Sequence, residues 1–107
     1  MRRVYNKLVR DHIPAIIQQH GDISETEIMT EVEFQQALRQ KLVEEAQEVI
    51  QANSQYEIIK ELADLHEVID TLMQHSDITM DMIKAEQERR CSERGGFTQR
   101  TKLLWTE

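Results

Sequence analysis

The sequence contains few of the residues that interrupt helices or cross-link a chain. Of its 107 residues, three are Gly, one is Pro and one is Cys. A lone cysteine excludes a disulfide within the chain and suits a reducing compartment. Gly loses much backbone entropy in a helix and Pro lacks the N–H that a helix needs. Their scarcity, together with abundant Leu, Ile, Glu, Gln and Ala, favours helices over sheets.

Long apolar runs and a surplus of basic residues are also missing. No stretch approaches the ~20 apolar residues of a membrane span, and the first residues lack the apolar core of a signal peptide. The net charge is −7, which argues against a surface that binds nucleic acid. We therefore expect a cytoplasmic protein that binds neither membranes nor nucleic acid. The acidic balance is compatible with binding cations.

Four helical segments are predicted, and the connections between the last three are short. Short connections favour antiparallel neighbours, so we expect an all-α fold: a small antiparallel bundle of about four helices with short extended arms at both ends. The whole chain, residues 1–107, is expected to be one domain. The first helix follows a cap at Asp11 and stops at Gly21, the second spans about 31–52, the third about 56–75, and the fourth begins near Asp77 or Thr79 and ends near Glu93.

Carboxylates lie on or beside the apolar faces of the second and third helices. At about 100° per residue, Glu45 falls about 20° from Leu38, in the middle of an apolar stripe. Glu48 falls on the margin of that stripe, one turn along. On the third helix, Glu61 and Asp64 form a second pair three residues apart, on the flank of its apolar arc.

An ionised carboxylate in an apolar core must be paired, protonated or bound to metal, since its isolated charge is very costly. Two like-charged pairs on neighbouring helices would repel each other, and a divalent cation between them would remove the conflict. An all-oxygen ligand set without Cys or clustered His favours Mg²⁺ or Mn²⁺ over Zn²⁺. Two structural alternatives stay open: solvated acidic faces, and salt bridges to Lys41 or an arginine.

The acids fall in a recognisable motif. "EEAQE", then twelve residues, then "ELAD" has the form EExxE–x12–ExxD. It resembles the signature of the all-α nucleoside triphosphate pyrophosphatase superfamily, which includes MazG-like enzymes and phosphoribosyl-ATP pyrophosphohydrolase. "YNKLVRDHIP" and "ERGGFTQR" are similar to the two ends of a small MazG-like branch.

The resemblance implies a Mg²⁺-dependent hydrolase that cleaves the α–β phosphoanhydride of a nucleotide to a monophosphate and pyrophosphate. By motif position it implies Glu45, Glu48, Glu61 and Asp64 as metal ligands and Glu44 as an auxiliary catalytic acid beside Glu45. It also implies a homodimer or homotetramer. Basic side chains should hold the substrate phosphates, and the candidates are Lys7, Arg10, Arg94 and Arg100.

Three hypotheses follow for the function. The terminal motifs favour a MazG-like hydrolase of nucleoside triphosphates or related nucleotides, in a house-cleaning role. Phosphoribosyl-ATP hydrolysis in histidine biosynthesis ranks second, because "NKLVRD" and "GGF" look more like the MazG-like branch. A non-enzymatic helical interaction module, with solvated or salt-bridged acids, is the alternative of another class. Only the enzyme hypotheses require Mg²⁺ or Mn²⁺ at the four acids.

Overall fold

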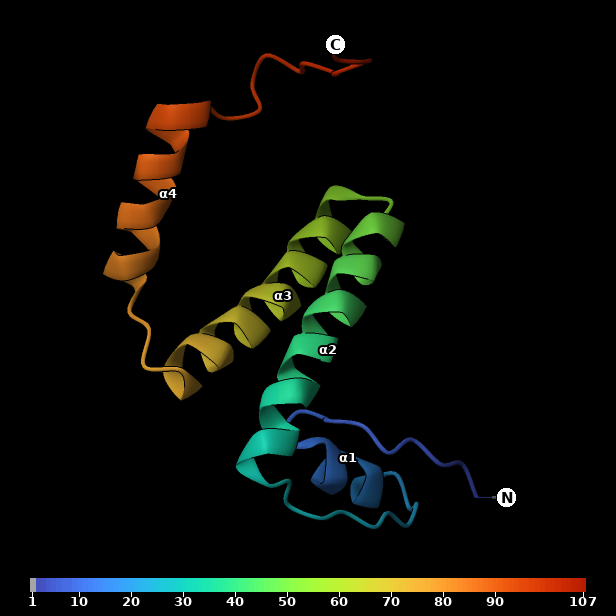
Figure 1. Cartoon of the computed structure of the whole chain (residues 1–107). Coiled ribbons are helices and arrows are strands. Elements are labelled where there is room, and N and C mark those ends of the chain that lie inside the picture. Colours follow the sequence, from blue (N-terminus) through green and yellow to red (C-terminus); the bar gives the residue numbers. More distant parts are fainter. Residues whose placement is uncertain (1) are drawn as a thin grey trace. The chain divides into compact units, whose positions relative to one another are not determined.

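A computed structural model describes residues 2–107, and it contains helices and irregular segments but no strand within that range (Figure 1). The predicted all-α class is confirmed, with 60% of the chain in helices. The predicted number of helices is confirmed as well. The helices are α1 (Ile13–Gln19), α2 (Glu31–Gln51), α3 (Gln55–His75) and α4 (Met80–Arg94).

Side-chain caps determine where the longer helices begin. Thr30 accepts a hydrogen bond from the backbone N–H of Glu33 at the start of α2, and Ser54 accepts one from Glu57 at the start of α3. Thr79 caps α4 in the same way. Each hydroxyl satisfies a backbone donor that has no partner within the helix.

The start of α1 differs from the sequence-based prediction. Asp11 was expected as its cap, but the N-cap residue is His12, which makes no side-chain capping bond. Pro14 occupies the first turn as expected, because its missing N–H would have no helical partner there. The sequence between α1 and α2 is compatible with a strand or an extended arm, and in the structure this segment contains no helix and no strand.

Helices α2 and α3 form an antiparallel hairpin, visible in Figure 1 as two helices side by side joined by a short turn. The turn spans only residues 52–54, which leaves no room for another arrangement. Leu38 of α2, with 2% of its surface exposed, is the one buried hydrophobic residue in the described part of the chain. The hairpin therefore rests on a very small core.

The chain divides into two compact units, one ending at Ser76 and the other covering Asp77–Glu107. The first holds α1, α2 and α3. The second holds α4, which ends at Gly95 with a φ of 81°, followed by an irregular tail. No helix in residues 2–107 has both the length and the apolarity that a membrane crossing needs. The single-domain prediction stays a prediction.

Candidate metal centre

The register of the α2–α3 hairpin places Glu45 opposite Glu61. Glu45 lies six residues before the end of α2 and Glu61 six residues after the start of α3. At 1.5 Å per residue, both therefore lie about 9 Å from the turn. Asp64 follows Glu61 by one turn on the same face of α3. The spacing between the two halves of the motif thus determines that the two helices present acids at the same level.

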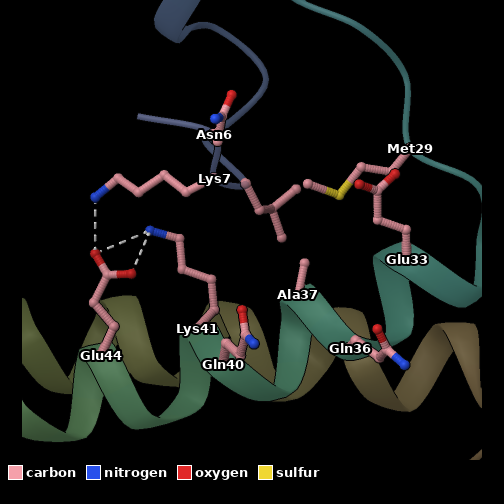
Figure 2. Close-up of a pocket in the computed structure, with 10 residues that line it drawn as sticks. Asn6, Lys7, Met29, Glu33, Gln36, Ala37, Gln40, Lys41 and Glu44 are labelled. Carbon is pink, nitrogen blue, oxygen red and sulfur yellow. Dashed lines mark hydrogen bonds and ion pairs between the residues drawn. The ribbon is translucent and has the colours of Figure 1, made fainter. Parts of the chain in front are cut away.

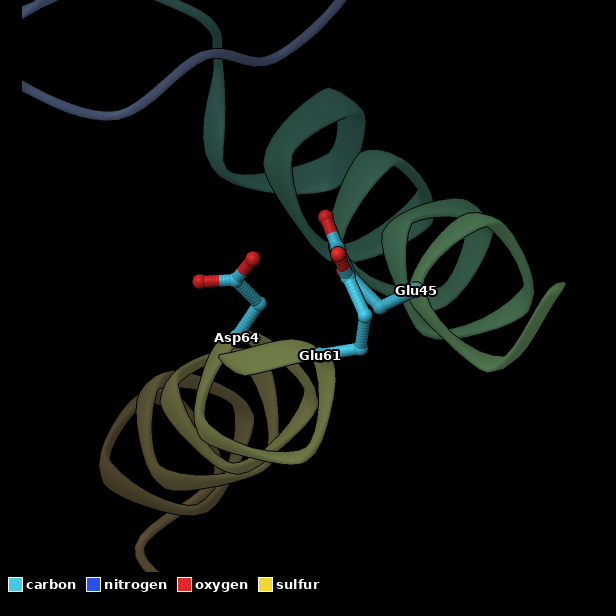
Figure 3. Close-up of side chains that lie close together, drawn as sticks. All are labelled: Glu45, Glu61 and Asp64. Atoms are coloured by element: carbon cyan, nitrogen blue, oxygen red, sulfur yellow. The ribbon is translucent and has the colours of Figure 1, made fainter. Parts of the chain in front are cut away.

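Three carboxylates converge at this level. Glu45, Glu61 and Asp64 each offer an oxygen atom, and these atoms all lie within 4.8 Å of one another. Figure 3 shows Glu45 reaching from α2 toward the two acids of α3. The side chains of Glu45 and Glu61 are 15% and 14% exposed, whereas that of Asp64 is 35% exposed. The group is therefore half-buried, with one side open to solvent.

The electrostatic environment of Glu45 disfavours its charged form. Burial raises the pKa of Glu45, and the neighbouring carboxylates, Asp64 first among them, raise it further. The Lys41 ammonium, 3.9 Å from a Glu45 oxygen, opposes this shift without reversing it. Glu45 is thus a carboxylate whose negative charge is incompletely balanced by the protein itself.

Glu48 is not part of the group of three. It is exposed and lies three residues nearer the turn, where it lines a pocket together with Glu61 of α3. The register explains its absence from the group, because the level of Glu48 on α2 faces the first turn of α3 rather than Glu61. Its assignment as a fourth metal ligand stays a prediction.

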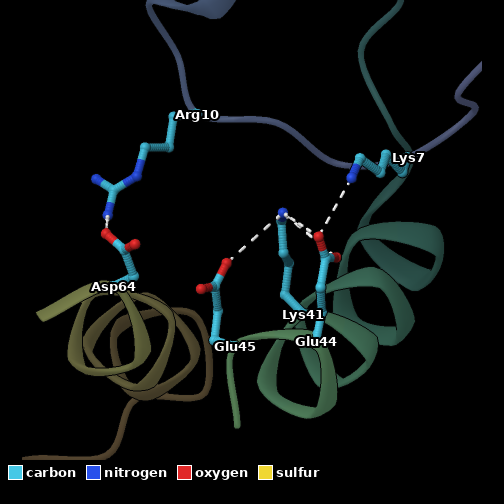
Figure 4. Close-up of polar contacts among 6 residues, drawn as sticks. All are labelled: Lys7, Arg10, Lys41, Glu44, Glu45 and Asp64. Atoms are coloured by element: carbon cyan, nitrogen blue, oxygen red, sulfur yellow. Dashed lines mark hydrogen bonds and ion pairs between the residues drawn. The ribbon is translucent and has the colours of Figure 1, made fainter. Parts of the chain in front are cut away.

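Two basic residues of the N-terminal arm, residues 2–12, contact acids of the motif (Figure 4). Arg10 donates a hydrogen bond to Asp64 at 2.8 Å, and Lys7 donates one to Glu44 at 3.2 Å. These contacts span 54 and 37 residues of sequence. The arm therefore brings two of the four predicted phosphate-binding residues beside the acidic group.

Glu44 lies between two lysines rather than within the group of three. Lys7 and Lys41 approach its two oxygens at 3.2 and 3.4 Å. Partial burial raises the pKa of Glu44, but the Lys7 hydrogen bond and the Lys41 charge outweigh it and bring the pKa below its ordinary value. Lys41 also reaches Glu45, so it links the two adjacent acids of the motif.

The other two predicted phosphate-binding residues lie in the second unit. Arg94 is the last residue of α4, and Arg100 has a φ of 57° in an exposed turn. Their role toward phosphate stays a prediction.

The residues at the centre suit a hard divalent cation. All three donors are carboxylates, the ligands that Mg²⁺ and Mn²⁺ prefer, and no sulfur or imidazole joins them. Their half-burial and mutual repulsion create a local demand for positive charge that Lys41 and Arg10 meet only in part.

The fold and this centre define an all-α protein with an acidic site between two antiparallel helices. A family model described as phosphoribosyl-ATP pyrophosphohydrolase matches residues 12–91, well over half of the chain. The chain belongs to this family, and through it to the MazG-like all-α nucleoside triphosphate pyrophosphatase superfamily. A comparison with curated proteins and one with solved structures gave no match.

Membership confirms two predictions from the sequence: the superfamily, and an enzyme that hydrolyses phosphoanhydride bonds. The matched family corresponds to the hypothesis that ranked second, phosphoribosyl-ATP hydrolysis, and supports it more specifically than the preferred nucleoside triphosphate hypothesis. The ranking rested on "NKLVRD" and "GGF", and both of these stretches lie outside residues 12–91.

Proposed function

We propose that the protein is a Mg²⁺-dependent pyrophosphohydrolase whose substrate is phosphoribosyl-ATP, cleaved between its α and β phosphates. The observation that carries the proposal is the convergence of Glu45, Glu61 and Asp64 in a chain matched by this family's model. We assign the metal to these three acids, with Glu48, which lines a pocket together with Glu61, completing the set. Mn²⁺ has the same preference for oxygen ligands and would replace Mg²⁺.

The divalent cation supplies positive charge at the phosphate oxygens and Lewis acidity toward water. The rest depends on the chain's own side chains. Arg10 and Lys7 lie beside the acids and present donors for the phosphate oxygens that enter from the open side. An arginine fork can bind two phosphate oxygens at once, which orients the phosphate chain.

Glu44 is the candidate for orienting the attacking water. Its lowered pKa keeps it ionised near neutrality, as a group that accepts a proton or a hydrogen bond from water must be. Lys41 keeps Glu44 beside Glu45 by reaching both carboxylates. Arg94 and Arg100 are proposed as further phosphate ligands.

A second candidate substrate class is the nucleoside triphosphates. Its support is the N-terminal arm, since Lys7 and Arg10 contact the acids from a segment that lies outside the matched residues 12–91. That segment carries the "NKLVRD" motif, which resembles the MazG-like branch.

Self-association is part of the proposal. Apolar side chains along α3 remain exposed, among them Ile58 (41%), Ile59 (59%) and Leu62 (40%). An exposed apolar face of this kind favours a protein interface, and we propose a homodimer or homotetramer. Light scattering coupled to size exclusion would measure it, and a monomer at all concentrations would refute it.

The function is tested by incubating the protein with Mg²⁺ and either phosphoribosyl-ATP or a panel of nucleoside triphosphates. Monophosphate-type product plus pyrophosphate is expected, with phosphoribosyl-ATP giving the highest kcat/KM. Glu45→Gln and Glu61→Gln should each lower kcat about 100-fold or more, as the loss of a group that positions transition-state charge does.

Glu67→Gln is the matched control, an exposed acid on α3 outside the acidic group. It should retain the wild-type rate. Higher kcat/KM on a triphosphate would select the second candidate. No hydrolysis of any substrate, with melting temperature unmoved by Mg²⁺ or Mn²⁺, would favour the interaction module instead.

A further inference from the structure

A pocket lies between the N-terminal arm and one face of α2 (Figure 2). Its volume is about 170 Å³, and we call it the arm–α2 pocket. The α2 residues that line it recur every three or four positions and so share one side of the helix, running from Glu33 through Gln36, Ala37 and Gln40 to Lys41 and Glu44. The pocket thus follows α2 toward the acidic centre.

The arm closes the other side of the pocket. Asn6, with a φ of 47°, bends the backbone there, and Asn tolerates this left-handed conformation better than most residues. Leu8 of the arm and Met29, which precedes α2, both line the pocket. The Lys7–Glu44 ion pair fastens the arm at the end nearest the acidic centre.

The chemistry of the lining changes along its length. Lys7 and Lys41 meet Glu44 at the end next to Glu45. Between the two ends, Gln36, Ala37 and Gln40 line the pocket. Two ammonium and two carboxylate groups balance, so the pocket has no excess positive charge that would hold a polyphosphate chain. An uncharged polar group with apolar faces suits it better.

We propose that the arm–α2 pocket binds the adenine base and ribose of the substrate, with Gln36 and Gln40 reading the base. This inference rests on the proposed function, because it places the nucleoside beside a centre that holds the phosphates. A pocket of this size is smaller than the roughly 300–1,000 Å³ sites that enclose whole ligands, so it holds one part of the nucleotide.

The glutamine amides indicate adenine. A glutamine offers a donor and an acceptor side by side, which pair with the acceptor N7 and the amino group N6 of adenine. Guanine presents two acceptors at the same edge. The amide oxygen of a glutamine would therefore lie opposite another acceptor and could form no hydrogen bond with it. Leu8, Met29 and Ala37 supply apolar contact for the faces of the base.

The test measures binding without hydrolysis. α,β-Methylene-ATP carries the base but resists cleavage, and methylenediphosphonate is a pyrophosphate analogue without base or sugar. Both are titrated calorimetrically, with Mg²⁺, into the full-length wild type and into Gln36→Ala, Gln40→Ala and Ala37→Leu. Gln47→Ala is the matched control, an exposed glutamine of α2 outside the pocket.

Gln36→Ala and Gln40→Ala should each weaken α,β-methylene-ATP about tenfold or more, within the range for losing one bidentate base contact. Ala37→Leu should weaken it as well, because the larger side chain fills part of the pocket. Their affinity for methylenediphosphonate and that of Gln47→Ala for both ligands should match the wild type. α,β-Methylene-GTP should bind the wild type more weakly than the ATP analogue. Unchanged methylenediphosphonate binding also shows that a variant has folded. Gln40→Ala should pass this control, because Gln40 is exposed and its truncation leaves the helix intact.

Equal affinity of all variants for α,β-methylene-ATP would overturn the assignment of the pocket to the nucleoside. An equal loss of affinity for α,β-methylene-ATP and methylenediphosphonate would overturn it too. A separate assay of hydrolysis distinguishes the two proposals. Hydrolysis by the wild type with unchanged KM in Gln40→Ala would refute the pocket and leave the function standing. Selective loss of analogue binding in a protein that hydrolyses nothing would support the pocket and refute the function.

Discussion

Replacing Glu45 by Gln should stabilise the protein when no divalent cation is present. Glu45 is 15% exposed, and its charge lies close to those of Glu61 and Asp64. Gln has nearly the same shape but carries no charge, so the substitution removes repulsion without creating a cavity. A residue chosen for metal binding rather than for stability should behave in this way.

The size of the effect follows from the distances. Two carboxylates at the 4.8 Å limit of this group repel by about 1 to 3.5 kcal/mol for an effective dielectric constant between about 80 and 20. Lys41 at 3.9 Å attracts Glu45 by about 1 to 4 kcal/mol on the same scale. Two repulsions against one attraction leave a gain of about 1 to 3 kcal/mol for Glu45→Gln. The raised pKa of Glu45 agrees in sign, because its surroundings favour the neutral form.

Addition of Mg²⁺ should stabilise the wild type relative to Glu45→Gln. A ligand at ten times its dissociation constant stabilises the folded wild type by about 1.4 kcal/mol, whereas Glu45→Gln should gain little. Urea unfolding followed by circular dichroism, once in chelator and once in Mg²⁺, measures both differences. Glu67→Gln, the exposed acid of α3, should track the wild type under both conditions.

Two results would contradict the reasoning. If Glu45→Gln is less stable than the wild type in chelator, the Lys41 ion pair outweighs the repulsion and Glu45 is a structural salt-bridge partner. If Mg²⁺ stabilises Glu45→Gln as much as the wild type, the cation binds elsewhere.

The remaining predictions concern the core, a cap and the arm. Leu38→Ala should lower the free energy of unfolding by about 2 to 5 kcal/mol, and a urea titration would show this as a lower unfolding midpoint. Val43→Ala, at a 59% exposed position, should leave the midpoint nearly unchanged. Ser54→Ala should cost about 0.5 to 2 kcal/mol, since it removes the cap of α3; thermal unfolding would reveal it, and an unchanged midpoint would show that the cap contributes nothing. Arg10→Gln should lower stability by less than about 1 kcal/mol because its ion pair with Asp64 is exposed, yet raise KM in the hydrolysis assay. An unaltered KM would remove Arg10 from the phosphate site.

The helices followed from local sequence. The predicted ends of the second and third helices agree with α2 and α3 to within one residue, because caps such as Ser54 and the apolar periodicity act over a few positions. The predicted Asp11 cap was wrong, because the N-cap residue is His12 and it makes no side-chain capping bond. Pro14 is compatible with more than one position in the first turn, so it does not determine where the helix begins. The arm and the α1–α2 connection lack such periodicity, and the sequence left them open.

For the candidate site as well, some features follow from local sequence and others depend on the tertiary structure. Periodicity on α2 places Glu45 on the apolar stripe, and the motif spacing selects Glu61 and Asp64, because positions on one helix follow from its 3.6-residue period. Which acids meet depends on the hairpin register, and the structure gathers three of the four and leaves Glu48 nearer the turn. The contacts of Lys7 and Arg10, and the glutamine-lined pocket, join segments far apart in sequence. No local period encodes them, so only the tertiary structure decided them.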